Sequence, residues 1–394
     1  VEGFEQEKLI FYDLARQAQK APFALGNSLA AYFGYLYIQD KSSMLPPLYL
    51  NPDPGAVVLD MCASPGSKTG ILSQLVGPEG LIIANEPNPG RMQTLRQNLQ
   101  QMNLCNVVTC QYKGQDLALE PESMPYILLD APCSGWGTVD KNPQVIKIWK
   151  QGRLDSLLNL QRELLSKAAR ILAPGGKLLY STCTTNEQEN EEQVNWVQNE
   201  FGLKLLDLKV KKDFFLSKSE KAKGSLHVLG QESGSQGFFM ACLQKPGKQI
   251  NKVQGPARSI PEMHIDAPEL ENISGVNWSN LPAGRVRAFT KRIYFLPKKA
   301  YDLVPEALRW KGFFLGHLRK ESLYIHPRVQ ILLPATQEKD NIIFSETKQL
   351  RKLLSGQSLT VQCTGKQTGL YWRELPLGWL TVKKNRCLWS VPSS

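Results

Sequence analysis

The sequence has few of the features that mark a metal site, a disulfide framework or a membrane protein. Its four histidines lie far from metal-ligand spacing and its eight cysteines form no C-x-x-C pair, so we expect no bound metal. The longest apolar run, residues 29–38, is too short to span a bilayer. No signal peptide, internal repeat or low-complexity tract is recognisable, so we expect a cytoplasmic protein without a membrane partner. Because the first residue is Val1 rather than Met, we also expect an upstream piece to be missing.

Negative charge is scarce in the last part of the chain. The 394 residues carry a net charge of +11. Residues 1–244 hold 23 Lys and Arg against 25 Asp and Glu, a balance of −2, whereas residues 245–394 hold 24 against 11, a balance of +13. An excess of positive charge that is placed so unevenly favours a nucleic-acid partner over a merely soluble basic surface.

Short apolar runs alternate with helical periodicity between residues 57 and 243. Strands are predicted at 57–61, 81–84, 107–110, 127–130 and 176–180, with closing strands at 203–208 and 237–243. Helices are predicted at 67–75, 90–102, 154–171 and 187–197. This succession predicts an α/β fold with a doubly wound sheet.

Changes in composition divide the chain into four parts. Residues 1–38 are predicted to form a helical arm, and residues 39–245 the sheet domain. Residues 246–275 are polar with few large apolar side chains, which indicates a linker. Residues 276–394 contain short apolar runs interleaved with Arg and Lys, and we expect a basic region that is mostly β or mixed α/β.

A cofactor pocket is indicated at the ends of the first three strands. The G-x-G-x-x-G dinucleotide fingerprint is absent, and a single glycine before Lys68 does not make a phosphate loop. The first strand leads instead into a tight loop of small residues, in which Gly66 allows close approach to a ligand, and then into a helix start that offers free N–H groups to a carboxylate. Glu86 is placed to bind ribose hydroxyls and Asp116 an adenine amino group.

Two cysteines come directly after neighbouring strands further along the chain. Residues 127–185 are predicted to form a strand–helix–strand unit, whose geometry brings the carboxyl ends of two parallel strands side by side. Asp130 and Cys133 lie at the end of one strand and Cys183 at the end of the other, in polar turns rather than within the strands. Buried cysteines are common and need carry no function, but this placement aims both at the ligand-binding edge.

Several long motifs in this order resemble the Nop/Sun family of RNA 5-methylcytosine methyltransferases, and most of all the bacterial small-subunit ribosomal RNA methyltransferase F branch. The matching runs are Ile38-Gln39-Asp40-Lys41-Ser42-Ser43, Cys62-Ala63-Ser64-Pro65-Gly66-Ser67-Lys68-Thr69, Asp130-Ala131-Pro132-Cys133-Ser134-Gly135, Tyr180-Ser181-Thr182-Cys183-Thr184 and Glu189-Asn190-Glu191. The likeness covers about residues 34–243.

The resemblance implies a Rossmann-like class I methyltransferase sheet that binds S-adenosylmethionine and methylates cytosine C5 in RNA, with 16S ribosomal RNA as the substrate. It implies cofactor contacts from Cys62, Ala63, Ser64, Pro65, Gly66, Ser67, Lys68, Glu86, Asp116 and Asp130. It further implies that Cys183 attacks C6 and that Cys133 assists product release. The C-terminal run Pro376-Leu377-Gly378-Trp379-Leu380 resembles a PUA-like RNA-binding module, and we expect a monomer.

The chemistry of cytosine explains the need for these residue types. C5 is a poor nucleophile until a thiolate adds at C6, and a base must later remove the C5 proton so that the thiolate can leave. Asp130 is placed to hydrogen-bond the ring N3 and the exocyclic amine. The target base must also leave its stack to reach such a pocket. Trp136 replaces a smaller or polar residue of the family, and we expect its ring to stack on the flipped base.

Other functions fit the sequence less well. A DNA cytosine methyltransferase could use Cys133 but has no need of Cys183, and an amino-group methyltransferase would carry an aromatic residue at the Cys133 position. Methylation of tRNA cytosine, and a non-catalytic RNA-binding role in ribosome assembly, stay open as alternatives.

Overall fold

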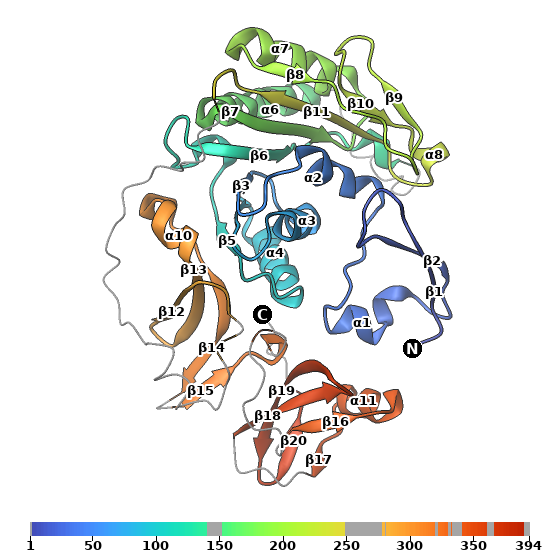
Figure 1. Cartoon of the computed structure of the whole chain (residues 1–394), viewed down its shortest axis with the longest axis vertical. Helices are drawn as coiled ribbons and strands as arrows, with labels where there is room; N and C mark the ends of the chain where they lie inside the picture. The colour runs from blue at the N-terminus through green and yellow to red at the C-terminus, as the bar shows by residue number, and fades with distance from the viewer. Residues whose placement is uncertain are drawn as a thin grey trace.

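A nine-stranded β-sheet, the large sheet, forms the centre of the region between residues 57 and 244 (Figure 1). The structure is a computed structural model that describes residues 2–139, 152–248, 278–279, 281–319, 322–329, 332, 341–360 and 366–389. The strands are β3 (Val57–Asp60), β4 (Leu81–Asn85), β5 (Val107–Cys110), β6 (Met124–Asp130), β7 (Leu172–Thr182), β8 (Lys204–Leu206), β9 (Leu216–Lys218), β10 (Leu226–Val228) and β11 (Phe238–Gln244).

The order of the strands is that of a doubly wound fold, as predicted. The path runs β5-β4-β3-β6-β7-β11-β10-β9, with β8 pairing with β11. Strands β3 to β7 are parallel, and β11 is antiparallel to β7. The chain winds outwards from β3 to β5 and then resumes on the other side with β6. The crevice between the ends of β3 and β6 is therefore the switch point at which such sheets bind ligands.

Helices cover both faces of the large sheet (Figure 1). They are α2 (Leu45–Leu50), α3 (Ser67–Val76), α4 (Pro89–Gln101), α6 (Gly152–Ile171), α7 (Glu191–Phe201) and α8 (Gly230–Ser233), with short 3₁₀ turns η2 (Ser42–Met44), η3 (Gly114–Asp116), η4 (Trp136–Thr138) and η5 (Glu187–Glu189). Local sequence fixes where they start and stop. Helix α4 begins where the Asn88 side chain accepts a hydrogen bond from the Arg91 amide, and α7 ends at left-handed Gly202.

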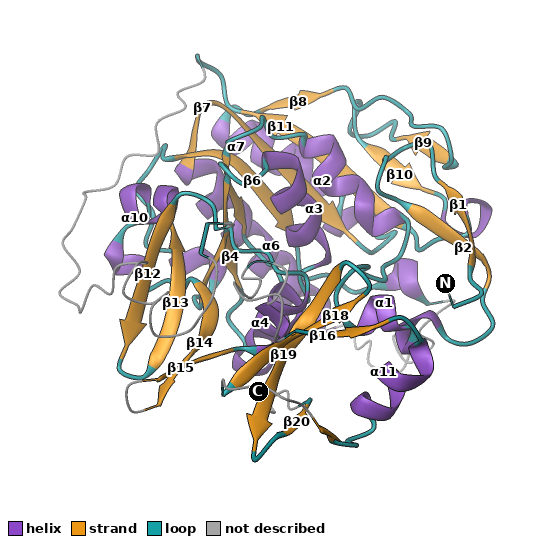
Figure 2. Cartoon of the chain, turned by 60° about the horizontal axis from the view of Figure 1, so that its bottom comes forward, coloured by secondary structure: helices purple, strands orange, loops and turns teal. Residues whose placement is uncertain are grey.

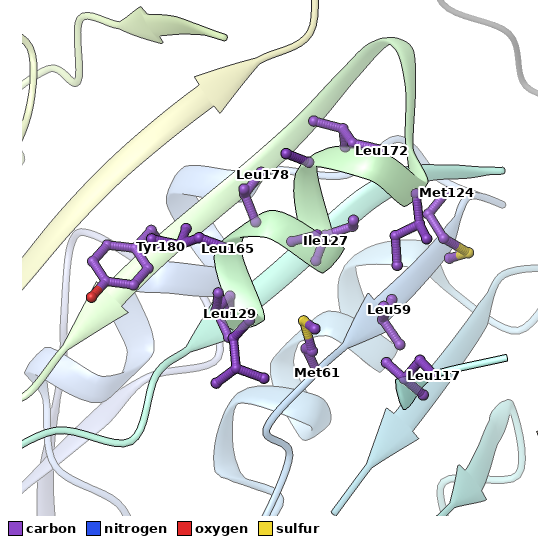
Figure 3. Packing of buried hydrophobic residues seen from close by; sticks show 14 of the residues in the cluster. Leu59, Met61, Leu117, Met124, Ile127, Leu129, Leu165, Leu172, Leu178 and Tyr180 are labelled. Atoms are coloured by element: carbon purple, nitrogen blue, oxygen red, sulfur yellow. The ribbon is translucent and has the colours of Figure 1, made fainter. Parts of the chain in front are cut away.

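The side chains of the strands alternate between two apolar cores, one on each face of the large sheet. Figure 3 shows the core beneath α6, where Leu59, Ile127 and Leu178 from three neighbouring strands pack against Leu165. All four are fully buried. Each such side chain stabilises the fold by roughly 1.5–3 kcal/mol, so this face holds the strand ends in a fixed relation.

The amino-terminal segment differs from the prediction. Residues 1–38 were expected to be helical, but the structure contains an antiparallel hairpin of β1 (Glu5–Lys8) and β2 (Arg16–Lys20), followed by η1 (Leu25–Asn27) and a single short helix, α1 (Leu29–Tyr32). The helical prediction is wrong for the hairpin, because every residue of both strands is exposed and neither offers an apolar stripe to a core.

The C-terminal region contains two further sheets, which lie side by side below the large sheet in Figure 1 and in front in Figure 2. The four-stranded sheet joins β12 (Gly284–Phe289), β13 (Arg292–Pro297), β14 (Phe313–Arg319) and β15 (Ser322–Ile325). The five-stranded sheet has the order β16-β18-β19-β20-β17, made of β16 (Ile342–Phe344), β17 (Leu359–Thr360), β18 (Gln367–Trp372), β19 (Leu375–Lys383) and β20 (Arg386–Leu388). Helices α10 (Lys298–Leu303) and α11 (Thr347–Leu354) and the turns η6 (Glu306–Leu308) and η7 (Pro327–Val329) complete the mixed α/β region that was predicted.

Both C-terminal sheets are packed against earlier parts of the chain. Ala300, Val304 and Leu308 belong to the buried core beneath α6, and Phe33 belongs to the core of the five-stranded sheet. The predicted linker 246–275 lies outside the described residues except for 246–248, and the division of the chain at 38, 245 and 275 stays a prediction. Across the described ranges, no helix is long and apolar enough to cross a membrane.

Candidate active site

The two predicted cysteines meet at the carboxyl ends of β6 and β7. These strands are parallel neighbours with Asp130 opposite Ser181, so the turns at their ends lie side by side. The Sγ atoms of Cys133 and Cys183 are 3.0 Å apart, and the Cys183 amide donates to the Cys133 Sγ over 3.3 Å. Both are free thiols. The distance is far beyond an S–S bond of about 2.05 Å and corresponds to a hydrogen bond between the two groups.

The two thiols have opposite acidities. The hydrogen bond from Cys133 lowers the pKa of Cys183 and outweighs burial, with the positive charge of Lys68 acting in the same direction. The same hydrogen bond, together with burial, raises the pKa of Cys133 well above its ordinary value. Cys183 is therefore the more acidic thiol of the pair and Cys133 the less acidic one.

Asp130 and Lys68 form a partly buried ion pair next to the cysteines. The Lys68 Nζ lies 2.6 Å from the Asp130 Oδ2, while the Ser181 hydroxyl donates to the Asp130 Oδ1 over 2.9 Å. Burial acts to lower the pKa of Lys68, but attraction and hydrogen bonding to Asp130 outweigh it and the pKa is raised. The Lys68 side chain also lies over the Phe238 ring, 5.1 Å from its centroid. Lys68 is therefore a charged donor held at the rim where the cysteines lie.

The loop predicted to hold the cofactor connects β3 to α3. Its Ser64–Pro65 peptide is cis and Gly66 has a φ of +106°, a conformation that favours glycine. The loop is held from outside by α4, since Arg91 donates to the Ser64 carbonyl over 2.9 Å and Asn98 donates to the Pro65 carbonyl over 2.8 Å. Helix α3 starts at Gly66 without a side-chain cap, so no capping side chain occupies its first N–H groups.

The other predicted cofactor residues lie after β4 and β5. Glu86 is only 2% exposed, and its carboxylate accepts from the Asn88 amide over 2.9 Å and lies 3.4 Å from the Arg91 Nε. Asp116 ends the turn η3 and is exposed. Cys62, in contrast, is a small neutral side chain, because burial raises the pKa of its thiol far above the ordinary value. A buried acid at the second strand and open amides at α3 fit the ribose and the carboxylate of S-adenosylmethionine.

Asp60 is a buried acid that the sequence motifs did not single out. It is 1% exposed, and it accepts a 2.6 Å hydrogen bond from the Thr69 hydroxyl on one oxygen. Its other oxygen has no hydrogen-bond partner among the described residues. Burial raises the pKa of Asp60 to about 7. A carboxylate at the end of an otherwise apolar strand, residues 57–60, was the signal that could have found it.

Glu189 was also missed as a functional residue, although it belongs to a matching motif. Its buried carboxylate accepts from the Ser134 amide over 2.8 Å, from the Ser134 hydroxyl over 2.5 Å and from the Gln161 side chain over 3.0 Å. The Ser134 hydroxyl in turn lies 2.8 Å from that of Thr184. Ser134 and Thr184 each come directly after a cysteine, so Glu189 fastens the two cysteine turns together.

Trp136 begins η4, directly after the Cys133 turn, and is half-buried. The next residue, Gly137, donates its amide to the Cys183 carbonyl over 3.0 Å, and a Cβ at Gly137 would come within 2.9 Å of that oxygen. Trp136 is thus carried on a backbone that is held close to Cys183. Stacking of its ring on a flipped base stays a prediction.

Fold and site together define an S-adenosylmethionine-dependent methyltransferase. Residues 47–244, half of the chain, match the family described as 16S rRNA methyltransferase RsmB/F, and the chain belongs to this family. It is 31% identical over 357 residues to the ribosomal RNA small subunit methyltransferase F of Shewanella amazonensis, a match that covers 87% of this chain and 75% of that protein. The methyltransferase F of Pectobacterium atrosepticum is 38% identical over 236 residues, 58% of this chain and 48% of that protein.

Solved structures agree with this assignment. A methyltransferase homolog protein from Pyrococcus horikoshii superposes with a TM-score of 0.54 at 32% identity, over 62% of this chain and 79% of that one. NSun6 from Pyrococcus horikoshii, crystallised with SFG, gives a TM-score of 0.51 at 29% identity, over 59% of this chain and 60% of that one. The resemblance to the Nop/Sun family, the Rossmann-like fold and the cofactor S-adenosylmethionine are thereby confirmed.

Proposed function

We propose that this protein methylates C5 of a cytosine in RNA, with 16S ribosomal RNA as its substrate. The observation that carries the proposal is the pair of sulfur atoms 3.0 Å apart beside the Lys68–Asp130 ion pair. A methyltransferase that acts on an oxygen or an amine needs no thiolate, whereas cytosine C5 must first be activated by a nucleophile at C6. The relatives named ribosomal RNA small subunit methyltransferase F support the choice of RNA.

Cys183 begins the reaction as the thiolate. It adds to C6 of the flipped base, so that a C–S bond forms and the C5–C6 double bond opens towards C5. Lys68 stands next to Asp130 with a raised pKa and is the donor that offsets negative charge gathering on the ring. Asp130 accepts from the exocyclic amine and fixes the orientation of the base. Bound S-adenosylmethionine supplies the electrophilic methyl group that C5 attacks.

Cys133 completes the reaction. Its pKa is raised chiefly because its proton is shared with the neighbouring thiolate of Cys183. Once Cys183 is bonded to carbon, that thiolate no longer exists, and Cys133 releases its proton to water, which carries away the one proton that methylation sets free. As a thiolate, Cys133 then takes the proton from C5, the electrons restore the C5–C6 double bond, and the bond between Cys183 and C6 breaks. The two cysteines end with the proton on Cys133 and the charge on Cys183, as they began.

Two variants test these roles with a cytosine-containing fragment of 16S ribosomal RNA and a radiolabelled methyl donor. Cys183→Ala is expected to transfer no methyl group and to form no covalent adduct. Cys133→Ala is expected to accumulate a covalent protein–RNA complex that survives denaturing electrophoresis. An adduct with the first variant and none with the second would reverse the assignment of the roles.

The unaltered protein provides the test between an enzyme and a binding protein. If it binds the fragment but yields neither methyl transfer nor adduct, a non-catalytic assembly factor is favoured. The same assay with tRNA decides between the two RNA classes, and we expect the ribosomal fragment to be the better substrate. A monomer in the cytoplasm is the form in which we expect the protein to act.

A further inference from the structure

One face of the four-stranded sheet carries a row of aromatic rings, the aromatic ladder, made of Phe289, Tyr294, Phe314 and His317. Neighbouring rings meet edge to face: the centroids of Phe289 and Tyr294 are 5.6 Å apart, those of Tyr294 and Phe314 5.5 Å, and those of Phe314 and His317 4.9 Å. Phe289 is 36% exposed and the other three are half-buried. The ladder crosses three strands, and none of its four residues is fully buried, although Arg287, which lies opposite Tyr294 on the same face, is.

Strand pairing explains why the rings gather on one face. Tyr294 lies opposite Phe314 across the β13–β14 pair, and a register shift beside it brings the rings of neighbouring strands together. The opposite face supplies Ile293, Phe295 and Leu315 to a separate buried core. These alternate residues already fill the interior. The rings of the ladder are therefore not needed to complete that core, although aromatic side chains of this size are usually used in that way.

Three cations, the cation cluster, lie beside the ladder. They are Arg96 from α4, Arg292 from β13, and Lys311, which comes shortly before β14. Lys311 exchanges two backbone hydrogen bonds with Thr109 of β5, and the Arg96 Nε donates to the Thr109 hydroxyl over 3.0 Å. Burial lowers the pKa of Lys311, and repulsion from Arg96 and Arg292 lowers it further. Arg292 lies opposite Phe289 in the β12–β13 pair and opposite His317 in the β13–β14 pair, which places the cluster against the ladder.

The cation cluster has no compensating acid in the described part of the chain, where none of the three residues forms an ion pair with a carboxylate. Three cations held together in this way repel one another, and a bound anion would relieve that repulsion. The rings beside them present flat apolar faces and edges. A ligand that complements both features carries negative charge at regular intervals and planar groups between the charges.

We propose that the aromatic ladder and the cation cluster form a binding platform for single-stranded RNA, separate from the catalytic crevice. Bases stack on aromatic side chains while Arg and Lys contact the phosphates between them, and such stacking is tolerant of sequence. Duplex RNA hides the faces of its bases and fits this surface less well. The choice of RNA as the ligand rests on the proposed function. The platform would hold an unpaired stretch of the same RNA whose cytosine enters the crevice.

Ring-retaining and ring-removing variants of the full-length chain test the stacking. Tyr294→Leu combined with Phe314→Leu keeps apolar bulk but removes two rings, whereas Tyr294→Phe with Phe314→Tyr keeps both. We expect the Leu pair to weaken binding of an unstructured oligouridine by about tenfold or more, as measured by fluorescence anisotropy, with little change for the ring-retaining pair. Equal affinities for the two pairs, both folded by circular dichroism, would overturn the proposal.

Charge variants test the phosphate contacts in the same assay. Arg292→Gln with Lys311→Gln should lower the slope of log affinity against log salt by about 1.4, because each single-strand phosphate contact contributes roughly 0.7. The charge-conserving pair Arg292→Lys with Lys311→Arg should keep the slope. An unchanged slope in the Gln pair contradicts the platform. If the Gln pair instead weakens binding only to assembled ribosomal subunits and not to oligouridine, the surface belongs to a protein partner, which also contradicts the platform.

Ultraviolet cross-linking gives a readout that needs no variant. Oligouridine cross-linked to the unaltered protein should appear by mass spectrometry on peptides from residues 284–319, and cross-links only elsewhere would refute the platform. All these measurements use binding alone, without a methyl donor. If the protein binds RNA through the ladder but transfers no methyl group, the proposed reaction is disproved and the platform is still supported. If the enzyme is active but the Leu pair binds RNA as well as the unaltered protein, the platform is disproved and the proposed reaction is still supported.

Discussion

The large sheet and the four-stranded sheet use β-strands in different ways. In the large sheet, parallel strands end together, and the residues just beyond them meet at one edge: Asp130 and Cys133 at the end of β6, Cys183 at the end of β7. In the four-stranded sheet, the residues of interest lie within antiparallel strands and form a row across a face. The first arrangement gathers a few groups in a half-buried crevice suited to chemistry. The second spreads rings and charges over a surface suited to recognition.

Electrostatics show the same contrast. At the crevice, opposite charges and hydrogen-bond partners are placed together: Lys68 pairs with Asp130, and Glu189 accepts four hydrogen bonds from the side chains and backbone around the cysteine turns. At the four-stranded sheet, like charges are placed together. Partnered charges hold a geometry, whereas like charges attract an oppositely charged ligand. Variants should therefore affect rate at the crevice and affinity at the four-stranded sheet.

Among the residues around the two cysteines, the largest loss is expected at Asp130. Asp130→Asn removes the negative charge that holds Lys68 while leaving a side chain of the same size, so the base is no longer oriented and Lys68 is no longer fixed. We expect kcat to fall by about 10²- to 10⁴-fold with a smaller change in RNA affinity. Single-turnover methylation and anisotropy, run on one preparation, measure the two effects. If a drop in RNA affinity accounts for the whole loss, the claim that variants at the crevice affect rate rather than affinity is contradicted.

A smaller loss is expected at Glu189, which touches neither cysteine. Glu189→Gln keeps the contact with Ser134 but weakens it, because a neutral amide accepts hydrogen bonds less strongly than a carboxylate. Loosened cysteine turns should lower kcat by up to about 10²-fold and leave the KM for the methyl donor unchanged. Glu187→Gln, a neighbouring acid that pairs with exposed Lys221, serves as the control and should be silent.

The pH dependence of adduct formation tests the coupling of the two thiols. Cys183 has a pKa below its ordinary value of 9.0 because Cys133 donates a hydrogen bond to it. Adduct formation should therefore rise with pH and level off below the range of an ordinary thiol. In Cys133→Ala the donor is lost and the pKa of Cys183 should move upwards, so the rise shifts to higher pH. Cys133→Ser keeps a donor and should shift it less. An identical profile in the Ala variant would show that the thiols are not coupled.

The smallest effect concerns stability at Asp60. Its pKa is raised by burial from 3.8 to about 7, so the folded state holds the proton after the unfolded state has lost it. Stability from this group is complete below about pH 4 and declines as pH rises towards 7. Asp60→Asn, which cannot ionise, should flatten that decline. Thermal unfolding of the cofactor-free protein at pH 5 and pH 8 measures it, and a pH dependence equal to that of the unaltered chain would contradict the raised pKa.

More of the crevice than of the four-stranded sheet could be predicted from the sequence. Apolar periodicity located β3 to β7, and because parallel strands end at one edge, placing Cys133 and Cys183 after two of them was enough to bring them together. The contact between Lys68 and Asp130, and the role of Glu189, depend on side-chain directions that spacing does not give. The hairpin of β1 and β2 was missed because its polar residues carry no periodic signal. The aromatic ladder depends on the register of three antiparallel strands, which the sequence leaves open.

The most direct measurement is to trap the covalent intermediate on the unaltered protein. RNA that carries 5-fluorocytosine in place of cytosine cannot lose a proton from C5, so a protein that works by this route should stop with the RNA attached after methyl transfer. Proteolysis and mass spectrometry would then locate the attached nucleotide. A bond to Cys183 is the predicted result, and a bond to Cys133, or methylated RNA released without any adduct, would contradict the account.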